Sequence, residues 1–414
     1  MTGKENDLAA SNTTRFYYGY VIVLAAFIVI VCSYIIRYSF GVFFKPIVIE
    51  FGWTRAITSG AYTLSWFFEG LLGIAFGGLT DRFGPRAVLS FCGFFMGLGC
   101  VLLSQLSATW QLYVFYGIIF GIGISGVWVP LVSTVARWFK SRRGMMTGIV
   151  LSGMGISALI GAPLANWLIS SYGWRDSFII VGGLVGCIII LASQFLKRAP
   201  LSIEQEANKH VNNNADLNST VVEFSLRKAM STRQFWLIFT MFFCFGFGSF
   251  SIILHIVPHA TDIGISAASA ANILAALGGA MILGRIILGS IADKIGARQI
   301  FIIGLVIFSV TLILLLYTRE LWLFYILCAL QGFGHGGMGA SESLLIAEIF
   351  GLRSLGIIMG VAGFGFTIGA GVGPLVTGHI FDISSSYDIA FILNAALCAI
   401  GLILTLLIRT KNYR

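Results

Sequence analysis

Six ionisable side chains lie inside long apolar stretches of this sequence. They are Arg37, Glu69, His255, Arg285, His335 and Glu342. A charged group at the centre of a bilayer costs roughly 3 kcal/mol or more, so such residues must be buried in protein or line an aqueous cavity. An arginine there can bind an anion, a carboxyl group or histidine can carry a proton, and opposite charges can form a permanent bridge. The chemistry indicated is the binding of a small anion and the transfer of a proton.

Arg285 gives the clearest signal, in the stretch Leu283-Gly284-Arg285-Ile-Ile-Leu-Gly289. A guanidinium holds a carboxylate with two parallel hydrogen bonds and does not lose its charge. In a poorly hydrated cavity it needs a partner of opposite charge. That partner is either a small organic anion or one of the acids Glu342 and Glu69. We interpret Arg285 as the main contact for an anionic substrate.

Three more residues are predicted to contact the substrate. Arg37 can offer a second guanidinium, and Tyr34, one turn earlier, can offer a hydroxyl to a hydroxy-acid. His335 lies among glycines, and such a bare surface lets another group approach closely. Structural alternatives stay open for each. Arg37 can form a buried bridge with Glu69, and Tyr34 and His335 can be ordinary packing residues.

The proton requires a group that can titrate in the membrane. Glu342 is the first candidate because it shares the C-terminal half of the chain with Arg285. Glu69 is the second candidate and His335 the third, and His255 is also retained as a proton-coupling candidate. A proton on such an acid would free an arginine to bind the substrate carboxylate, so proton and anion would favour each other's binding.

These residues must be carried by membrane helices. The 414 residues are 57% hydrophobic and only 10% charged, whereas a soluble domain has about 25% charged residues. A spanning helix needs about 20 apolar residues. Twelve apolar runs occur, at 17–45, 56–79, 85–106, 110–136, 145–170, 174–196, 234–258, 267–292, 298–317, 321–347, 355–379 and 387–408. The prediction is an all-α membrane protein with twelve transmembrane helices.

One ten-residue pattern, G-x-x-x-D-[R/K]-x-G-x-R, occurs twice, 212 residues apart. Its positions are Gly77, Asp81, Arg82, Gly84 and Arg86 in the first copy and Gly289, Asp293, Lys294, Gly296 and Arg298 in the second. The glycines suit a tight turn between two helices, and the Asp with its basic neighbours suits a charge cluster that locks adjacent helices and gates the structure. This fixed spacing predicts a chain built from two pseudo-symmetric six-helix bundles.

The basic residues predict the orientation. Of the 26 Lys and Arg residues, 20 lie at the termini or in the loops of the same side, four lie in the opposite loops, and two lie within apolar runs. This excess places both termini in the cytoplasm and accounts for the net charge of +9 without a nucleic-acid partner. The predicted division is a tail at 1–16, a bundle at 17–197, a cytoplasmic linker at 198–230, a bundle at 231–409 and a tail at 410–414.

The duplicated loop pattern resembles the hallmark of the major facilitator superfamily of secondary transporters. Four stretches also resemble the monocarboxylate-transporter group and its bacterial relatives, including oxalate/formate exchangers; they are 40–45, 255–266, 283–289 and 373–382. The resemblance implies two bundles that rock about a central site, with helices 2, 5, 8 and 11 along the seam between them. It also implies that Arg285 binds the substrate carboxylate and that Glu342 stands where the family often has Glu.

Some positions depart from that family. Met281 stands where animal members carry an Asp one turn before the arginine of helix 8, and the resemblance assigns that Asp to proton movement. Glu69 precedes Met281 by 212 residues, so the first half has an acid at the pseudo-symmetric position. Arg37 lies one place from a reactive Lys of helix 1. Residues 355–379 lack the Lys that dicarboxylate exchangers have in helix 11, which disfavours a doubly charged substrate, although Arg37 keeps it open.

The sequence therefore favours a proton-linked symporter of small monocarboxylates such as lactate or pyruvate, working by alternating access. An organic-anion exchanger of the oxalate/formate type is the alternative, and a non-transporting membrane sensor is a more remote one. We expect no enzyme activity, catalytic residue, metal or cofactor, because the sequence has no spaced His/Cys cluster, nucleophile elbow or phosphate loop. We expect a multi-pass monomer of the inner (cytoplasmic) membrane, with the monocarboxylate, the proton and the lipid bilayer as its partners.

A cysteine introduced at Ala215, in the linker 198–230, tests the orientation. We expect an impermeant thiol reagent added outside intact cells to leave it unlabelled, because the excess of basic residues places this linker in the cytoplasm. The same cysteine should react once the cells are opened. Labelling from outside would overturn the predicted orientation.

Overall fold

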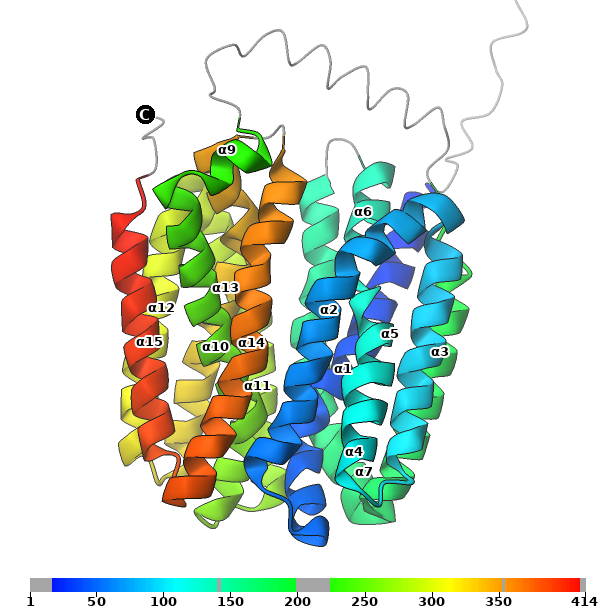
Figure 1. Ribbon diagram of the computed structural model, residues 1–414, viewed down its shortest axis with the longest axis vertical. Coiled ribbons are helices and arrows are strands. Elements are labelled where there is room, and N and C mark those ends of the chain that lie inside the picture. Colours follow the sequence, from blue (N-terminus) through cyan, green and yellow to red (C-terminus); the bar gives the residue numbers. More distant parts are fainter. Residues whose placement is uncertain (1–16, 140–142, 199–223, 352–353, 410–414) are drawn as a thin grey trace, which may run out of the picture.

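The computed structural model describes residues 17–139, 143–198, 224–351 and 354–409, and all the regular elements in these ranges are helices. They form two bundles that stand side by side (Figure 1). The first bundle contains α1 (Gly19–Phe51), α2 (Arg55–Phe83), α3 (Pro85–Leu103), α4 (Thr109–Leu112), the π-helix η1 (Tyr113–Phe120), α5 (Gly121–Ser125), α6 (Trp128–Trp138) and α7 (Arg143–Ser193). The second contains α9 (Leu226–Met230), α10 (Arg233–Asp262), α11 (Ala267–Ile295), α12 (Ala297–Tyr317), α13 (Leu321–Phe350), α14 (Leu355–Ser384) and α15 (Asp388–Leu407).

Together these helices make twelve membrane crossings. Nine helices within the described residues are long and apolar enough to cross a membrane, and the bent helix α2 is a tenth. Helix α7 contains two crossings, because Gly173 has non-helical dihedral angles (φ 80°, ψ 163°) between them. Helix α13, with 30 residues, packs beside α11 and α12 and completes the set. The predicted all-α fold of two six-helix bundles is confirmed.

Local sequence signals fix the ends of these helices. The side chains of Thr54, Thr232 and Ser266 each accept a hydrogen bond from a backbone N–H in the first turn of α2, α10 and α11. Gly84 ends α2 with φ 87° and Gly296 ends α11 with φ 90°. Only glycine adopts such values without strain, which explains why both copies of the repeated loop pattern carry it there.

The two copies of the loop pattern hold the bundles in different ways. In the first, Asp81 forms an ion pair of 2.5 Å with Arg137 at the end of α6. In the second, Glu348 of α13 accepts a hydrogen bond of 3.2 Å from the backbone N–H of Ala297, and Asp293 has no partner among the described residues. The predicted charge lock is therefore formed in the first copy, and the described contact of the second copy is a hydrogen bond between the start of α12 and Glu348 of α13.

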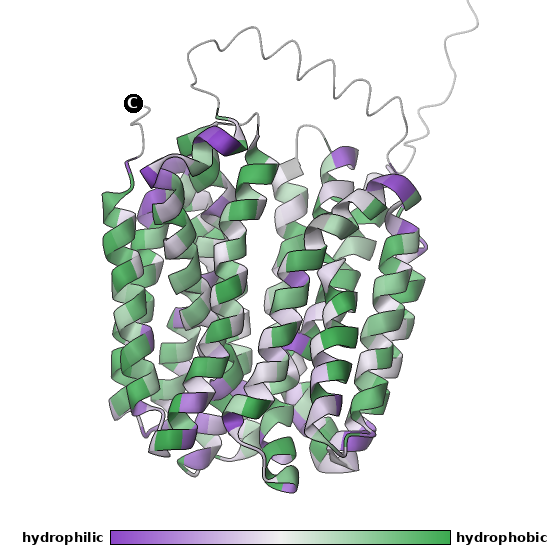
Figure 2. Ribbon diagram, viewed as in Figure 1, coloured by the Kyte–Doolittle hydropathy of each residue, from purple (hydrophilic) through white to green (hydrophobic). Residues whose placement is uncertain are grey.

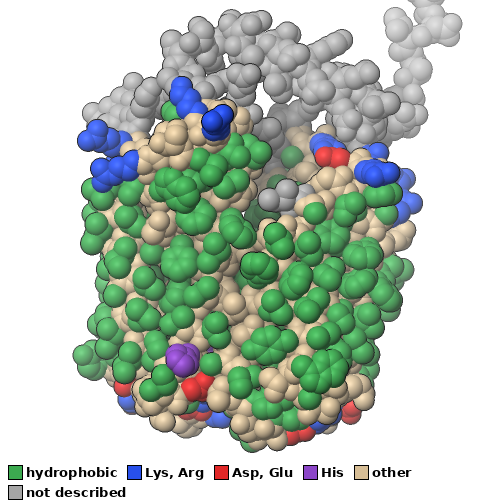
Figure 3. Space-filling view, viewed as in Figure 1, with side chains coloured by type: hydrophobic (Ala, Val, Ile, Leu, Met, Phe, Trp, Pro, Cys, Tyr) green, Lys and Arg blue, Asp and Glu red, His purple; other side chains and the backbone are tan. Residues whose placement is uncertain are grey.

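Hydrophobic residues predominate along the helices, and hydrophilic residues are concentrated toward the two ends of the bundles (Figure 2). We call the end where α1 begins and α15 ends the proximal end, and the opposite end the distal end. Lys and Arg side chains gather at the proximal end of the face shown in Figure 3. Most of the predicted linker, 199–223, lies outside the described residues, and its last part contains the short helix α9.

The bundles meet along three pairs of helices: α7 with α11, α2 with α14, and α1 with α10. Helices 2, 5, 8 and 11 of the sequence-based numbering are α2, the first part of α7, α11 and α14, so the predicted seam is confirmed. Small residues bring the backbones close. A Cβ added to Gly371 of α14 would lie 3.2 Å from the Cβ of Trp66 in α2, and one added to Gly378 would lie 3.0 Å from the backbone of Arg55.

The seam is closed at the distal end and open at the proximal end. Gly371, Gly378 and Gly278 lie in the middle and distal parts, and each faces atoms of the other bundle. A Cβ added to Gly148 of α7 or Gly363 of α14, nearer the proximal end, would meet no atom within 4 Å. Figure 3 shows the surface hollowed between the bundles at this end. The molecule is in the conformation that opens a central site toward the proximal end.

Gly278→Ala should destabilise this conformation, because its Cβ would come 2.6 Å from the Cβ of Ala158 in the opposite bundle. Overpacking of this kind costs about 1–3 kcal/mol. Gly148→Ala is the matched control: it makes the same chemical change in a seam helix but meets open space. We expect thermal unfolding of the purified protein to show a lower melting temperature for Gly278→Ala and no loss for Gly148→Ala. Equal melting temperatures would contradict the closed distal seam.

Candidate substrate and proton site

Arg37 and Glu69 form an ion pair inside the first bundle. The Arg37 Nη2 atom of α1 lies 2.9 Å from Glu69 Oε2 of α2. The Arg37 side chain is 0% exposed and the Glu69 side chain is 12% exposed. The hydroxyl of Tyr34, one turn before Arg37, donates a hydrogen bond of 3.3 Å to Glu69 Oε1. The sequence left two partners open for Arg37, and in this conformation the bridge to Glu69 is formed.

Aromatic rings enclose the Arg37 guanidinium. Its central carbon lies 4.1 Å from the centre of the Trp66 ring, 5.5 Å from Tyr62 and 5.9 Å from Phe120. Rings at such distances attract a cation through their π faces and partly replace its lost hydration. Within the described residues, the Arg37 Nε and Nη1 atoms are buried without a hydrogen-bond partner. Glu69 is therefore the principal counter-charge of this guanidinium.

Arg285 lies on α11 at the seam between the bundles and is half-buried. One of its terminal nitrogens donates a hydrogen bond to the backbone carbonyl of Leu151 in α7, which belongs to the other bundle. Its Nε atom has no partner, and no carboxylate lies within ion-pair distance of it in the described part of the chain. The permanent ion pair with Glu342 or Glu69 that the sequence left open is not formed here. A neutral carbonyl group thus occupies the position beside this guanidinium that an anion could take.

The glycines of α13 bring its backbone against α11. A Cβ on Gly332 would lie 2.8 Å from the carbonyl carbon of Leu277, and one on Gly336 would lie 2.8 Å from the backbone nitrogen of Arg285. A Cβ on Gly284 of α11 would in turn lie 2.7 Å from the carbonyl carbon of Phe333. The sequence predicted that something approaches the glycine surface around His335. What approaches is the backbone of α11, and this contact fixes the position of Arg285.

His335 and Glu342 lie two turns apart on α13. His335 is buried, its ring centre lies 5.1 Å from that of Phe245 and 6.2 Å from that of Phe250, and its Nδ1 atom has no partner in the described residues. Glu342 is half-buried and interacts electrostatically with Arg285, but no hydrogen bond or ion pair joins it to a described residue. The two groups lie near Arg285 without contacting it directly.

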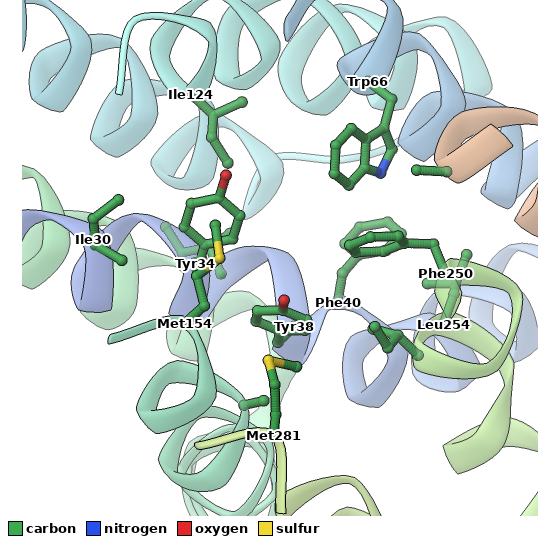
Figure 4. Close-up of a cluster of buried hydrophobic side chains, with 14 of the residues drawn as sticks. Ile30, Tyr34, Tyr38, Phe40, Trp66, Ile124, Met154, Phe250, Leu254 and Met281 are labelled. Carbon is green, nitrogen blue, oxygen red and sulfur yellow. The ribbon is translucent and has the colours of Figure 1, made fainter. Parts of the chain in front are cut away.

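Aromatic side chains from both bundles converge at the same level (Figure 4). Trp66 of α2 and Phe250 of α10 face each other with ring centres 4.6 Å apart. Tyr34 and Tyr38 occupy successive turns of α1, with ring centres 6.0 Å apart, and Met281 of α11 lies beside Tyr38. Sequence reasoning missed Tyr38, Trp66 and Phe250. The spacing of Tyr38 four residues after Tyr34 is the one signal that could have revealed it; the other two resemble any buried aromatic residue.

His255, retained as a proton-coupling candidate, lies in the distal part of the seam. Its ring is fully buried and both nitrogens have partners: Nε2 lies 2.9 Å from the carbonyl oxygen of Pro374 and 3.4 Å from the Ser59 hydroxyl, and Nδ1 lies 3.1 Å from the Tyr387 hydroxyl. These contacts join α10 to α14, to α2 and to the start of α15. The structure thus places His255 in the closed distal contact of the bundles and does not bring it to Arg285.

Ion pairs between the bundles close the distal end, beyond this histidine. Asp262, the last residue of α10, lies 2.9 Å from Lys45 Nζ of α1 and 2.5 Å from Arg55 Nη2 of α2. Asp382 of α14 accepts hydrogen bonds of 2.8 Å from the backbone N–H groups of Arg55 and Ala56, at the start of α2. Each contact crosses from one bundle to the other. We call these four residues Lys45, Arg55, Asp262 and Asp382 the distal gate.

Taken together, the geometry offers two arginines at the level where the bundles meet. Arg37 is paired with an acid, whereas Arg285 forms no ion pair with any described residue. Among the described residues, no group of three or more His, Cys, Asp and Glu could hold a metal ion. Two pseudo-symmetric helix bundles with charged groups near the contact between them are typical of a membrane transporter.

Comparison with known families agrees. The family model of the Major Facilitator Superfamily matches residues 26–286 and 249–414, so the chain belongs to this superfamily. The fold is similar to a crystal structure of a bacterial homolog of the human lysosomal transporter Spinster in an inward-facing and occupied conformation. The TM-score is 0.76 over 96% of this chain and 97% of that chain, at 17% identity.

Several relatives of known name are more similar in sequence. Monocarboxylate transporter 13 of Rattus norvegicus is 26% identical over 401 residues, which cover 94% of this chain and 89% of the relative. The MFS-type transporter YhjX of Escherichia coli is 27% identical over 71% of each chain. The oxalate:formate antiporter of Oxalobacter formigenes is 28% identical over 64% of this chain and 60% of its own length. The resemblance predicted from the sequence is thereby confirmed.

Asp262→Asn should weaken the distal gate. It removes the carboxylate shared by Lys45 and Arg55, and because these side chains are partly exposed the loss is roughly 1 kcal/mol, or about fivefold in the balance between conformations. We expect a cysteine placed at Thr63, whose hydroxyl now bonds to Gly371 across the seam, to react faster with a thiol reagent added from the distal side.

Asp176→Asn is the matched control, because Asp176 is exposed at the same end and forms no ion pair with a described residue. It should leave the labelling rate unchanged. Equal rates for Asp262→Asn and Asp176→Asn, both measured in a background lacking the exposed Cys187, would show that the gate does not set the conformational balance.

Proposed function

We propose that the protein transports small monocarboxylate anions, and that Arg285 binds the carboxylate. The observation that supports this most directly is the state of Arg285. It is a half-buried guanidinium at the seam, its Nε atom has no partner, and no acid pairs with it among the described residues. A buried charge without a counter-charge is unfavourable, so this site should bind an anion in preference to a neutral molecule.

The number of charges favours an anion with one carboxylate. Arg37 is neutralised by Glu69 at 2.9 Å, which leaves Arg285 as the uncompensated arginine of the site. Helix α14, unlike helix 11 of the dicarboxylate exchangers, carries no Lys or Arg within 355–379. Aromatic rings and Met281 lie nearby, so the apolar part of a small organic acid such as lactate or pyruvate would find apolar surroundings (Figure 4).

The position of Arg285 connects binding to movement. Its bond to the carbonyl of Leu151 crosses the seam, so a carboxylate that takes over this guanidinium changes a contact between the two bundles. A ligand shifts a conformational equilibrium only when it binds the two states with different affinity. An anion that competes with the bond between Arg285 and Leu151 binds the two states with different affinity, because that bond crosses the seam. We propose that this competition allows the bundles to rock.

Proton-linked symport is the preferred mode of transport, and exchange of organic anions is the second candidate. A carboxyl group that lies inside a membrane helix and is paired with an arginine, that of Glu69, supports proton linkage. Exchange is favoured by the oxalate:formate antiporter among the relatives and by Met281, which stands where the animal transporters have an Asp. We further propose that the protein works as a monomer in the cytoplasmic membrane, with its proximal end in the cytoplasm. The gathering of basic side chains at that end supports this orientation (Figure 3).

Arg285→Lys tests the role of the guanidinium. A single ammonium cannot reproduce two parallel hydrogen bonds to a carboxylate, and the loss of a bond to a charged group costs about 1.5–3 kcal/mol. We expect about tenfold to hundredfold slower uptake of labelled lactate or pyruvate into proteoliposomes. Arg319→Lys, at an exposed position of the distal end, is the matched control and should transport normally.

The same assay distinguishes the substrates and the mode of transport. Lactate, pyruvate, formate and oxalate are compared with and without an inward proton gradient. Stimulation by the gradient supports symport, and uptake that requires an anion inside supports exchange. Normal transport by Arg285→Lys at equal expression would show that Arg285 is structural.

A further inference from the structure

We propose that Glu69 carries the coupled proton, and that the substrate carboxylate held by Arg285 then also compensates the charge of Arg37. This inference rests on the proposed function, because it names the acid that links the proton to the carboxylate. It gives Glu69 precedence over Glu342, which the sequence had placed first. The ion pair in the first bundle and the burial of its arginine support this assignment.

Charge balance makes the proton and the anion interdependent at this pair. In the empty site Glu69 must be ionised, since it is the principal counter-charge of a guanidinium that is 0% exposed. A proton that binds Glu69 alone would leave Arg37 buried and uncompensated, which is unfavourable. An anion that binds Arg285 alone compensates only that guanidinium, because Arg37 stays paired with Glu69. When a proton neutralises Glu69, the same anion also compensates Arg37, so the proton and the anion favour each other's binding.

The position of Glu69 suits this role. Its side chain is 12% exposed whereas Arg37 behind it is fully buried, so a proton from the open side reaches the carboxylate without crossing the guanidinium. The proton binds one carboxylate oxygen, no other bond is formed or broken, and the same proton leaves when the anion leaves. The Tyr34 hydroxyl, 3.3 Å from Oε1, can donate to the carboxylate and can accept from the protonated acid.

Few other titratable groups face the pair. Tyr34 of α1, Tyr62 of α2 and Tyr116 of η1 surround Arg37, and their phenols remain neutral at physiological pH. From α14, Phe364 and Thr367 lie beside Gly70, the next residue after Glu69, and neither titrates. From α5, Gly121 packs on Ser65 and Phe68. Glu69 is thus the acid whose protonation changes the charge of this pair.

Unlike Glu69, Glu342 forms no ion pair with an arginine among the described residues. It interacts with Arg285 electrostatically, but no hydrogen bond or ion pair joins it to a described residue, and Arg285 is bonded to the carbonyl of Leu151 instead. Protonation of Glu342 therefore does not break a contact. The charge of Arg285 is available to an anion whether or not Glu342 is ionised, so Glu342 is the appropriate comparison in an experiment.

The test uses the full chain in proteoliposomes, with labelled lactate and pyruvate. An inward gradient of one pH unit lets a symporter accumulate its anion up to about tenfold. We expect this for the natural protein and for Glu342→Gln. Glu69→Gln should still exchange internal for external substrate, which moves no net proton, but should show no accumulation above equilibrium. Glu69→Asp, which keeps the titratable group, should restore part of the response.

Controls keep the result interpretable. Glu320→Gln removes an exposed carboxylate that precedes α13 and should behave as the natural protein. If Glu69→Gln does not fold because Arg37 loses its counter-charge, Arg37→Gln with Glu69→Gln gives a neutral pair, and it too should lose accumulation. A full gradient response in folded Glu69→Gln or in the double variant overturns the proposal, as does a response lost in Glu342→Gln alone.

The natural protein separates this inference from the proposed function. If the natural protein transports carboxylates but ignores the gradient, proton coupling through Glu69 is wrong while carboxylate transport stands. If it transports no carboxylate, the proposed function itself fails.

Discussion

The cost of placing arginine in a bilayer governs this structure. Arg37 and Arg285 both lie within membrane helices, and each must find compensation inside the protein. Arg37 finds it within its own bundle, from the carboxylate of Glu69 and from three aromatic rings. Among the described residues, the hydrogen-bond partner of Arg285 is a backbone carbonyl across the seam. The arginine of the first bundle therefore has an ion-pair partner, whereas the arginine of the second forms no ion pair with a described residue, which is why we propose it as the substrate contact.

Close backbone packing gives these charges their positions. Glycines on α11 and α13 let the two helices approach until backbone atoms are in contact, and side chains of ordinary size would prevent this. Arg285 belongs to this tightly packed pair, so it is held by a rigid part of the second bundle. The close packing of the glycines thus fixes where the backbone of Arg285 lies relative to α13.

The sequence was sufficient for the fold because each of its signals is local. Apolar length predicts a crossing, and a glycine with positive φ is needed wherever the repeated loop pattern turns, at Gly84 and Gly296. The sequence did not show which charged side chains pair with each other, because pairing depends on how each helix is rotated about its axis. Periodicity within one helix did not decide whether Glu69 faces Arg37 or Arg285. It also did not show that His255 lies in the distal contact, because its neighbours in sequence are equally apolar there.

The buried ion pair lies within one bundle, and the weaker, partly exposed ion pairs join the two bundles; this distribution suits alternating access. The ion pair of Arg37 and Glu69 is buried but lies within one bundle, so it need not break when the bundles rock. The contacts that must break, those of the distal gate, are partly exposed to solvent, with side-chain exposures of 31% for Lys45, 24% for Asp262 and 11% for Arg55. Exposed ion pairs contribute about 0–1 kcal/mol each. A gate built from such pairs can hold the distal end closed and still open at a cost of only a few kcal/mol.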